Sequence, residues 1–230
     1  MFDITPTEWT AILLSLRVAT VATIVATPLG IAFALLLARG NFWGKSFVDA
    51  AVHLPLVLPP VVTGYLLLLA FGRRGFIGAW LAEFGIVFAF RWTGAALACG
   101  VMAFPLLVRP IRLSIEAVDR RLEQAAETLG APPWRVFLNV TLPLSLPGVL
   151  AGMVLGFAKA IGEFGATITF VSNIPGETQT ISSAIYSLIQ TPDGDTAALR
   201  LVVVSIVMAV AALIGSEWFA RRATQRLHGN

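Results

Sequence analysis

The chain is poor in charged residues, cysteine and histidine, and each scarcity excludes a class of protein. Lys, Arg, Asp and Glu make up 13% of its 230 residues, against about 25% in an ordinary soluble domain. The one cysteine, Cys99, cannot form an internal disulfide framework or a thiolate metal cluster. His53 lies in an apolar stretch without a partner at metal-ligand spacing. We therefore expect no metal site, no bound cofactor and no catalytic site in this chain.

Apolar sequence is what the chain has in excess. Hydrophobic residues make up 57% of it and the mean hydropathy is +0.83, which is typical of an integral membrane protein. We expect an all-α, polytopic membrane protein with about five transmembrane helices and no nucleic-acid partner. Stretches long enough to span a bilayer, about 17–25 residues, cover 18–37, 50–71, 92–108, 146–171 and 197–218.

Two places in this pattern are irregular. Pro55, Pro59 and Pro60 interrupt the second stretch. The segment 77–90 is apolar but short and contains Glu83, which favours a re-entrant or interfacial segment over a sixth span. The N-terminal residues include no basic cluster, so we expect no cleaved signal peptide.

The basic residues predict the orientation. With the N-terminus outside and five spans, ten of the 16 Lys and Arg residues fall on the cytoplasmic side, as the positive-inside rule requires. This orientation places residues 111–143 and the tail 219–230 in the cytoplasm. A sixth span at 77–90 would put both termini on one side and weaken the prediction.

The segment 122–143 is a polar island between apolar stretches. Apolar residues recur at helical spacing from Ile111 to Leu129, and Gly130 then ends the pattern as a helix C-terminal glycine does. Pro132 and Pro133 suit the first turn of a second helix, and Pro143 ends the polar segment. An ordinary connecting loop is the alternative, but the Trp134 and Phe137 side chains in this polar segment favour a surface for a soluble partner.

On the opposite side, residues 181–189 carry apolar side chains at helical spacing after the loop SNIPGETQT. We expect a short helix on the outer surface. It has two interpretations, an interfacial anchor or a docking surface for an external partner.

Lys159 and Glu163 are charged residues within the fourth apolar stretch. Each charge costs about 2.5–3.5 kcal/mol at the centre of a bilayer, so neither is expected to face lipid. They lie four residues apart on one helical face, and the small residues Gly152, Gly156 and Ala160 allow another helix to approach. The pair either lines a pathway at a subunit interface or forms a structural salt bridge.

The polar island also carries a specific resemblance. The spacing Gln124-Ala125-Ala126, three residues, Gly130, nine residues and then Val140 to Pro143 resembles the EAA loop of bacterial ABC importer permeases. Gln124 stands where that family prefers Glu, and Val140 stands where Ile is usual. The stretches LARGNFWGKSFVDAAVHLPLVLPPVVTGYLLLLAFGRRGFIG and GEFGATITFVSNIPGETQT resemble molybdate permeases. Sulfate and tungstate permeases share much of this pattern, so the choice of ion stays open.

The resemblance implies a type I ABC importer transmembrane domain over residues 11–218, in a homodimer in the bacterial inner membrane. It also implies a soluble oxyanion-binding protein outside and separate ATPase subunits inside, which use the ATP. The sequence 40–46 mimics a phosphate-binding loop but has three residues between its glycines instead of four, so we expect no nucleotide site in this chain. The residues expected to couple to the ATPase are Glu123, Gln124, Ala125, Ala126, Gly130, Trp134, Arg135, Phe137 and Pro143.

The broken second stretch is a candidate for the transport pathway. Carbonyls freed by the prolines must face protein or a water-filled path at membrane depth, and hydroxyls and backbone amides there suit a small oxyanion. The pathway or gate candidates are Pro59, Pro60, Thr63, Gly64, Lys159, Glu163, Gly165 and Thr167. A secondary transporter or channel without an ATPase is a second hypothesis, although the chain shows no convincing internal repeat. A membrane-embedded sensor or assembly factor is a third.

Overall fold

The computed structural model describes residues 4–227 and, within α11, side chains only as far as residue 215, with residue 213 left aside. All regular elements of this described part are helical. They are α1 (Pro6–Arg39), α2 (Lys45–Val57), α3 (Pro60–Phe71), α4 (Phe76–Glu83), α5 (Trp92–Ala117), α6 (Arg120–Thr128), α7 (Pro133–Val136), the π-helical turn η1 (Phe137–Thr141), α8 (Leu142–Ile161), α9 (Gly165–Val171), α10 (Ile181–Leu188) and α11 (Asp195–Leu227).

Four helical runs within the described residues are long and apolar enough to cross a membrane. They are α1, α5, the continuous run Pro133–Ile161 and the Asp195–Ala212 part of α11. The bent pair α2 and α3 makes a fifth if it counts as one span. The chain is therefore an all-α polytopic membrane protein with four to five spans.

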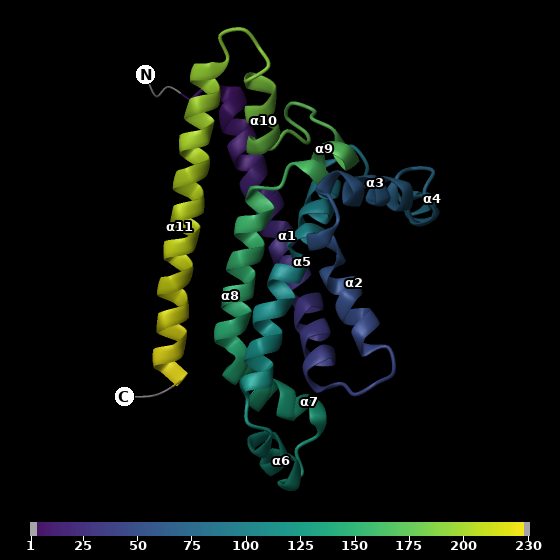
Figure 1. Ribbon diagram of the computed structural model, residues 1–230, viewed down its shortest axis with the longest axis vertical. Coiled ribbons are helices and arrows are strands. Elements are labelled where there is room, and N and C mark those ends of the chain that lie inside the picture. The colour runs from purple at the N-terminus through teal and green to yellow at the C-terminus, as the bar shows by residue number, and fades with distance from the viewer. Residues whose placement is uncertain (1–3, 228–230) are drawn as a thin grey trace.

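Helix α5 lies at the centre of the molecule, packed between α1 and α8 (Figure 1). Small residues permit this packing: a Cβ added at Gly152 would lie 2.6 Å from the Leu107 carbonyl oxygen of α5. Leu107, Val108 and Ile111 are fully buried in the core formed there. The groove predicted along Gly152, Gly156 and Ala160 is therefore filled by α5 of the same chain.

The second predicted span, 50–71, is not one straight helix. Helix α2 ends at Val57, α3 begins at Pro60, and the two are bent by 115°. Pro60 starts α3, where its missing N–H is tolerated, while Pro55 lies inside α2 without ending it. Helix α4 has eight residues, too few to span, and projects beside α3 at one edge (Figure 1).

The fourth predicted span has the wrong boundaries. The structure continues from α7 through η1 into α8 without a break, and Pro143, predicted to end the polar segment, lies in the first turn of α8. Helix α8 then ends at Ile161, with Gly162 as its C-cap residue. Residues 165–171, predicted as its continuation, form the separate helix α9.

Helix α1 is longer than the predicted span, whereas α10 lies where the sequence predicts a helix. Helix α1 starts at Pro6 rather than near residue 18, because Thr5 and Glu8 form a capping box that fixes its first turn. The helix predicted at 181–189 is present as α10, and its Ile181 and Ala184 are buried against α1 and α11. The predicted tail 219–230 is helical as far as Leu227, and its last three residues lie outside the described part.

Candidate functional site: a projecting helical segment and a packed helix junction

Helices α6 and α7 project from one end of the helical bundle (Figure 1). The chain turns at Val118, and the Asp119 side chain then caps α6 by accepting a hydrogen bond from the Arg121 N–H at 2.9 Å. Ile111 and Ile115 are fully buried in α5, whereas α6 has no buried residue. The single helix predicted from Ile111 to Leu129 is therefore wrong, because the Asp119 cap starts a new one.

Gly130 ends α6 as the sequence predicts. Its φ is +84°, in the left-handed region that favours glycine. The Gly130 N–H donates to the Glu127 carbonyl at 2.9 Å, and the Ala131 N–H donates to the Ala126 carbonyl at 3.1 Å. These two bonds form a Schellman motif, which sets the angle between α6 and α7.

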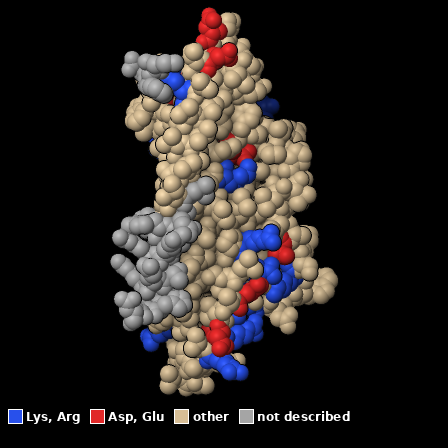
Figure 2. All heavy atoms as spheres, turned by 60° about the vertical axis from the view of Figure 1, so that its left-hand side comes forward, with Lys and Arg blue, Asp and Glu red and all other residues tan. Residues whose placement is uncertain are grey.

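Large apolar side chains are exposed on this projecting segment. Leu129 is 89% exposed and Trp134 is 60% exposed, and the Arg135 guanidinium lies 5.0 Å from the Trp134 ring centroid. Figure 2 shows that charged side chains gather at the same end of the molecule. Apolar anchors surrounded by charge, on a segment outside the apolar spans, are typical of a surface that docks a soluble partner.

The inner side of the segment is held to the bundle by polar contacts. Glu123 Oε1 accepts hydrogen bonds from the Thr141 hydroxyl at 2.7 Å and from Arg39 Nη2 at 3.1 Å. A hollow of about 380 Å³ lies beside them, lined also by Gln124 and Phe137. Of the predicted coupling residues, Glu123, Gln124 and Phe137 thus line one hollow, Trp134 and Gly130 are exposed, and Pro143 lies in α8.

Arg39 and Thr141 were not predicted as part of this site. Thr141 lies within the stretch Val140 to Pro143 that carries the resemblance to the EAA loop, so the sequence could have indicated it as a site residue. Arg39 is 84 residues away from Glu123 in the chain. A basic residue at the end of an apolar helix is common in membrane proteins, so no sequence pattern pairs it with Glu123.

The structure brings the two groups of pathway candidates together at the junction of α3 and α9. A Cβ added at Gly64 would lie 2.5 Å from the Ala166 carbonyl oxygen, and one at Gly165 would lie 2.7 Å from Pro60 Cβ. Thr63 is buried next to Gly64, and its hydroxyl has no hydrogen-bond partner among the described residues. Thr167 is buried as well and donates to the Phe164 carbonyl at 2.9 Å. Pro59 is exposed at the bend.

Lys159 and Glu163 lie at the end of α8, next to this junction. Lys159 Nζ contacts Glu163 Oε2 at 2.6 Å, and Glu163 Oε1 accepts the Ala166 N–H at 3.0 Å. The Glu163 side chain is 1% exposed and that of Lys159 is 29% exposed. The carboxylate therefore joins the end of α8 to the first turn of α9, and both interpretations of the pair remain predictions.

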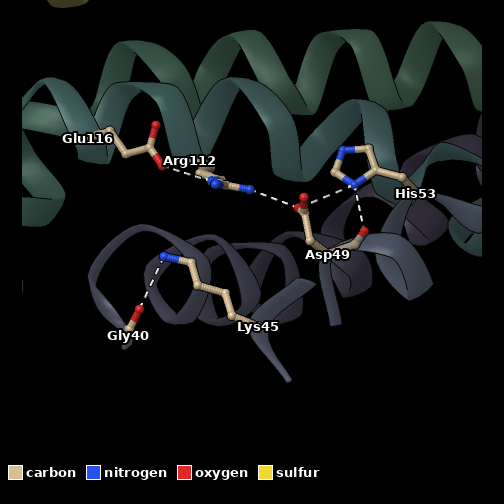
Figure 3. Close-up of polar contacts among 6 residues, drawn as sticks. All are labelled: Gly40, Lys45, Asp49, His53, Arg112 and Glu116. Atoms are coloured by element: carbon tan, nitrogen blue, oxygen red, sulfur yellow. Dashed lines mark hydrogen bonds and ion pairs between the residues drawn. The ribbon is translucent and has the colours of Figure 1, made fainter. Parts of the chain in front are cut away.

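A second polar cluster connects α2 to α5 (Figure 3). Arg112 lies between Asp49 and Glu116, with a contact of 2.8 Å to each carboxylate. The His53 ring nitrogen Nδ1 lies 2.8 Å from the Asp49 carbonyl oxygen. One ring nitrogen of His53 thus contacts the backbone of its own helix. No group of three potential metal ligands occurs among the described residues.

The apolar helices describe a polytopic membrane protein, and a family model identifies its class. The chain belongs to the family of binding-protein-dependent transport system inner membrane components, whose family model matches residues 26–225. It is therefore a multi-pass inner-membrane permease subunit.

Among the relatives that cover most of the chain are two permeases of Escherichia coli K12. The molybdenum transport system permease protein ModB of Escherichia coli K12 is 60% identical over 97% of this chain and 98% of its own length. The sulfate transport system permease protein CysT of the same organism is 36% identical over 85% of this chain and 70% of its own length.

Solved structures show the same fold at low identity. A bacterial ABC transporter that imports alginate gives a TM-score of 0.75 at 19% identity, covering 96% of this chain and 81% of its own. The methionine ABC transporter MetNI in an inward-facing conformation gives a TM-score of 0.74 at 16% identity, covering 96% and 99%. The helices thus have the arrangement of a type I ABC importer transmembrane domain.

Proposed function

We propose that this chain is the permease subunit of an ATP-driven importer that carries molybdate inward across a bacterial inner membrane. The observation that carries the proposal is the 60% identity to the molybdenum permease of Escherichia coli over almost the full length of both chains. Identity to the sulfate permease is lower, at 36%, which favours molybdate over sulfate as the cargo.

The chain would work as a homodimer, with the N-terminus outside and the C-terminus in the cytoplasm. A separate ATPase subunit would bind and hydrolyse the ATP and dock on the apolar surface around Leu129 and Trp134. The partly buried contacts of Glu123 and the continuous run from α7 into α8 support this proposal, because a rigid connection from α7 into the bundle transmits a rigid-body displacement. No cofactor would bind to this chain itself.

On the outer side, a soluble binding protein would deliver the oxyanion to the permease. The junction of α3 and α9, with Thr63, Gly64, Gly165 and Thr167, is our candidate for the gate of the pathway. Its support is the backbone contact that the two glycines permit, since small displacements of such closely packed helices switch between discrete arrangements.

Competition for uptake tests the choice of ion. Vesicles containing the permease, its ATPase and its binding protein would receive radiolabelled molybdate with an excess of unlabelled tungstate or sulfate. All three oxyanions are tetrahedral dianions, so size is what distinguishes them. We expect tungstate to compete because it is nearly the same size as molybdate, and the smaller sulfate to compete weakly. Full competition by sulfate, with sulfate taken up in preference to molybdate, would refute molybdate as the cargo.

A further inference from the structure

We propose that Arg39 is a positioning residue that makes α1 move together with the ATPase-docking segment, which comprises helices α6 and α7. The inference rests on the proposed function, because it concerns how motion of that segment reaches the spans. It adds to the predicted coupling residues a basic side chain that lies 84 residues before Glu123 in the sequence. The contacts that carry it lie at the point where α1, α5, α6 and η1 meet.

The Arg39 guanidinium joins two elements of the chain at once. Arg39 is the last residue of α1, and its Nη2 donates to the Val118 carbonyl oxygen and to Glu123 Oε1, both at 3.1 Å. Val118 is the C-cap residue of α5 and marks the turn between the bundle and α6. Arg39 therefore contacts both the end of α5 and helix α6, on either side of the turn at Val118.

The Glu123 carboxylate extends this contact to a fourth element. The oxygen that accepts from Arg39 also accepts the Thr141 hydroxyl at 2.7 Å. Thr141 is 3% exposed and ends η1, directly before α8. The side chains of Arg39 and Glu123 are 19% and 16% exposed. Because the ion pair is largely shielded from water, it is less weakened by solvent than a surface pair.

The connection matters because, within the described part of the chain, α6 packs mainly against α7 and η1. None of its residues is buried, so its position depends on the α7 side of the segment and on Glu123. Helix α1, in turn, runs the length of the bundle (Figure 1) and is tied at its far end to α11, where Arg200 donates to Glu8 at 2.8 Å. A displacement of α6 thus reaches the far end of the molecule through one helix.

The test measures coupling separately from assembly. Arg39→Gln and Arg39→Lys would be compared with Arg74→Gln, which alters an exposed arginine beyond the end of α3, in the complete complex in lipid vesicles. ATP hydrolysis and radiolabelled molybdate uptake would be measured in the same vesicles. We expect Arg39→Gln to keep the ATPase subunit and its hydrolysis but to lower uptake per ATP about tenfold, the ratio that corresponds to about 1.4 kcal/mol. Arg39→Lys, which keeps the positive charge, should lower uptake per ATP less than Arg39→Gln does. Uptake per ATP in Arg74→Gln should match that of the wild type.

A double-mutant cycle identifies the partner. Glu123→Gln removes the other charge, and the double variant leaves neither charge unpaired. We expect Arg39→Gln and Glu123→Gln to be non-additive in uptake per ATP, whereas Arg74→Gln and Glu123→Gln should be additive. Additive effects in the first pair, unchanged uptake per ATP in Arg39→Gln, or loss of uptake only in proportion to lost complex would each overturn the proposal. A wild-type complex without ATP-driven uptake would refute the proposed function instead.

Discussion

At the scale of single residues, variants of the Lys159–Glu163 pair can distinguish a structural role of the pair from a role in transport. Removing one charge by Lys159→Met or Glu163→Gln leaves the other without its partner in a largely buried site, with a cost of about 3–5 kcal/mol where such a pair is broken. We expect each single variant to reduce the amount of folded, assembled permease, measured by size-exclusion chromatography in detergent.

The double variant Lys159→Met/Glu163→Gln then decides between the interpretations, because the glutamine side chain keeps an oxygen that can accept the Ala166 N–H. If assembly and uptake both return, the pair is a structural salt bridge. If assembly returns while uptake stays low, the charges act in the pathway. A double variant that assembles no better than either single variant would contradict the expectation that the two charges depend on each other.

Gly130 gives a second prediction at this scale. A branched side chain at φ +84° is strained even in open surroundings, so Gly130→Val should redirect α7 without disturbing the spans. We expect weak retention of the ATPase subunit in a pull-down, as also for Trp134→Ala, which removes an exposed aromatic anchor. Gly85→Val is the matched control, because Gly85 has φ +75° and similarly open surroundings away from this segment. Equal retention by Gly130→Val, Trp134→Ala and the control would refute the docking role.

Residues with local causes were predictable from the sequence. The left-handed Gly130 follows from the helical pattern that ends there, and the Lys159–Glu163 contact follows from their spacing of four. Arg39 was not predictable as a partner of Glu123, because the contact depends on how α1 and α6 pack. The Thr63 hydroxyl, which has no hydrogen-bond partner among the described residues, was likewise recognisable only from the packing of α3 against α9.

At the scale of elements, the junction of α3 and α9 makes a packing prediction. Gly64→Ala would place a methyl group 2.5 Å from the Ala166 carbonyl oxygen, so the two helices must separate. Overpacking of this kind costs about 1–3 kcal/mol, and we expect a lower thermal unfolding midpoint in detergent. Gly100→Ala is the control, since its nearest neighbour atom lies at 3.7 Å and alanine favours the helix. Equal midpoints for the two variants would contradict this packing.

Helix boundaries were less predictable than helices. Apolar runs located the spans, but proline was an unreliable mark of their ends. Pro60 starts α3, whereas Pro28, Pro105, Pro110 and Pro147 lie inside helices. The breaks occur at capping residues instead: Asp119 is the N-cap of α6, and Gly162 is the C-cap of α8. The prolines indicated a break between α2 and α3, but the size of the bend, 115°, could not be predicted because it depends on the packing of α3 against α9.

At the scale of the whole molecule, the orientation in the membrane is testable. In a Cys99→Ala background, Glu127→Cys should be protected from an impermeant thiol reagent added outside, and Gln190→Cys should be labelled. The reason is that basic residues gather around the segment that carries Glu127, which favours the cytoplasmic side. Labelling of residue 127 from outside in sealed cells would reverse the predicted orientation.

The role of the ATPase distinguishes an importer from a secondary transporter or channel. The most direct measurement is uptake of radiolabelled molybdate by vesicles that contain the permease with its binding protein on one side, with and without the ATPase subunit and ATP on the other. An ATP-driven importer requires accumulation against a gradient only when both the ATPase and ATP are present. Equal uptake by the permease alone would contradict coupling through the segment from Glu123 to Phe137.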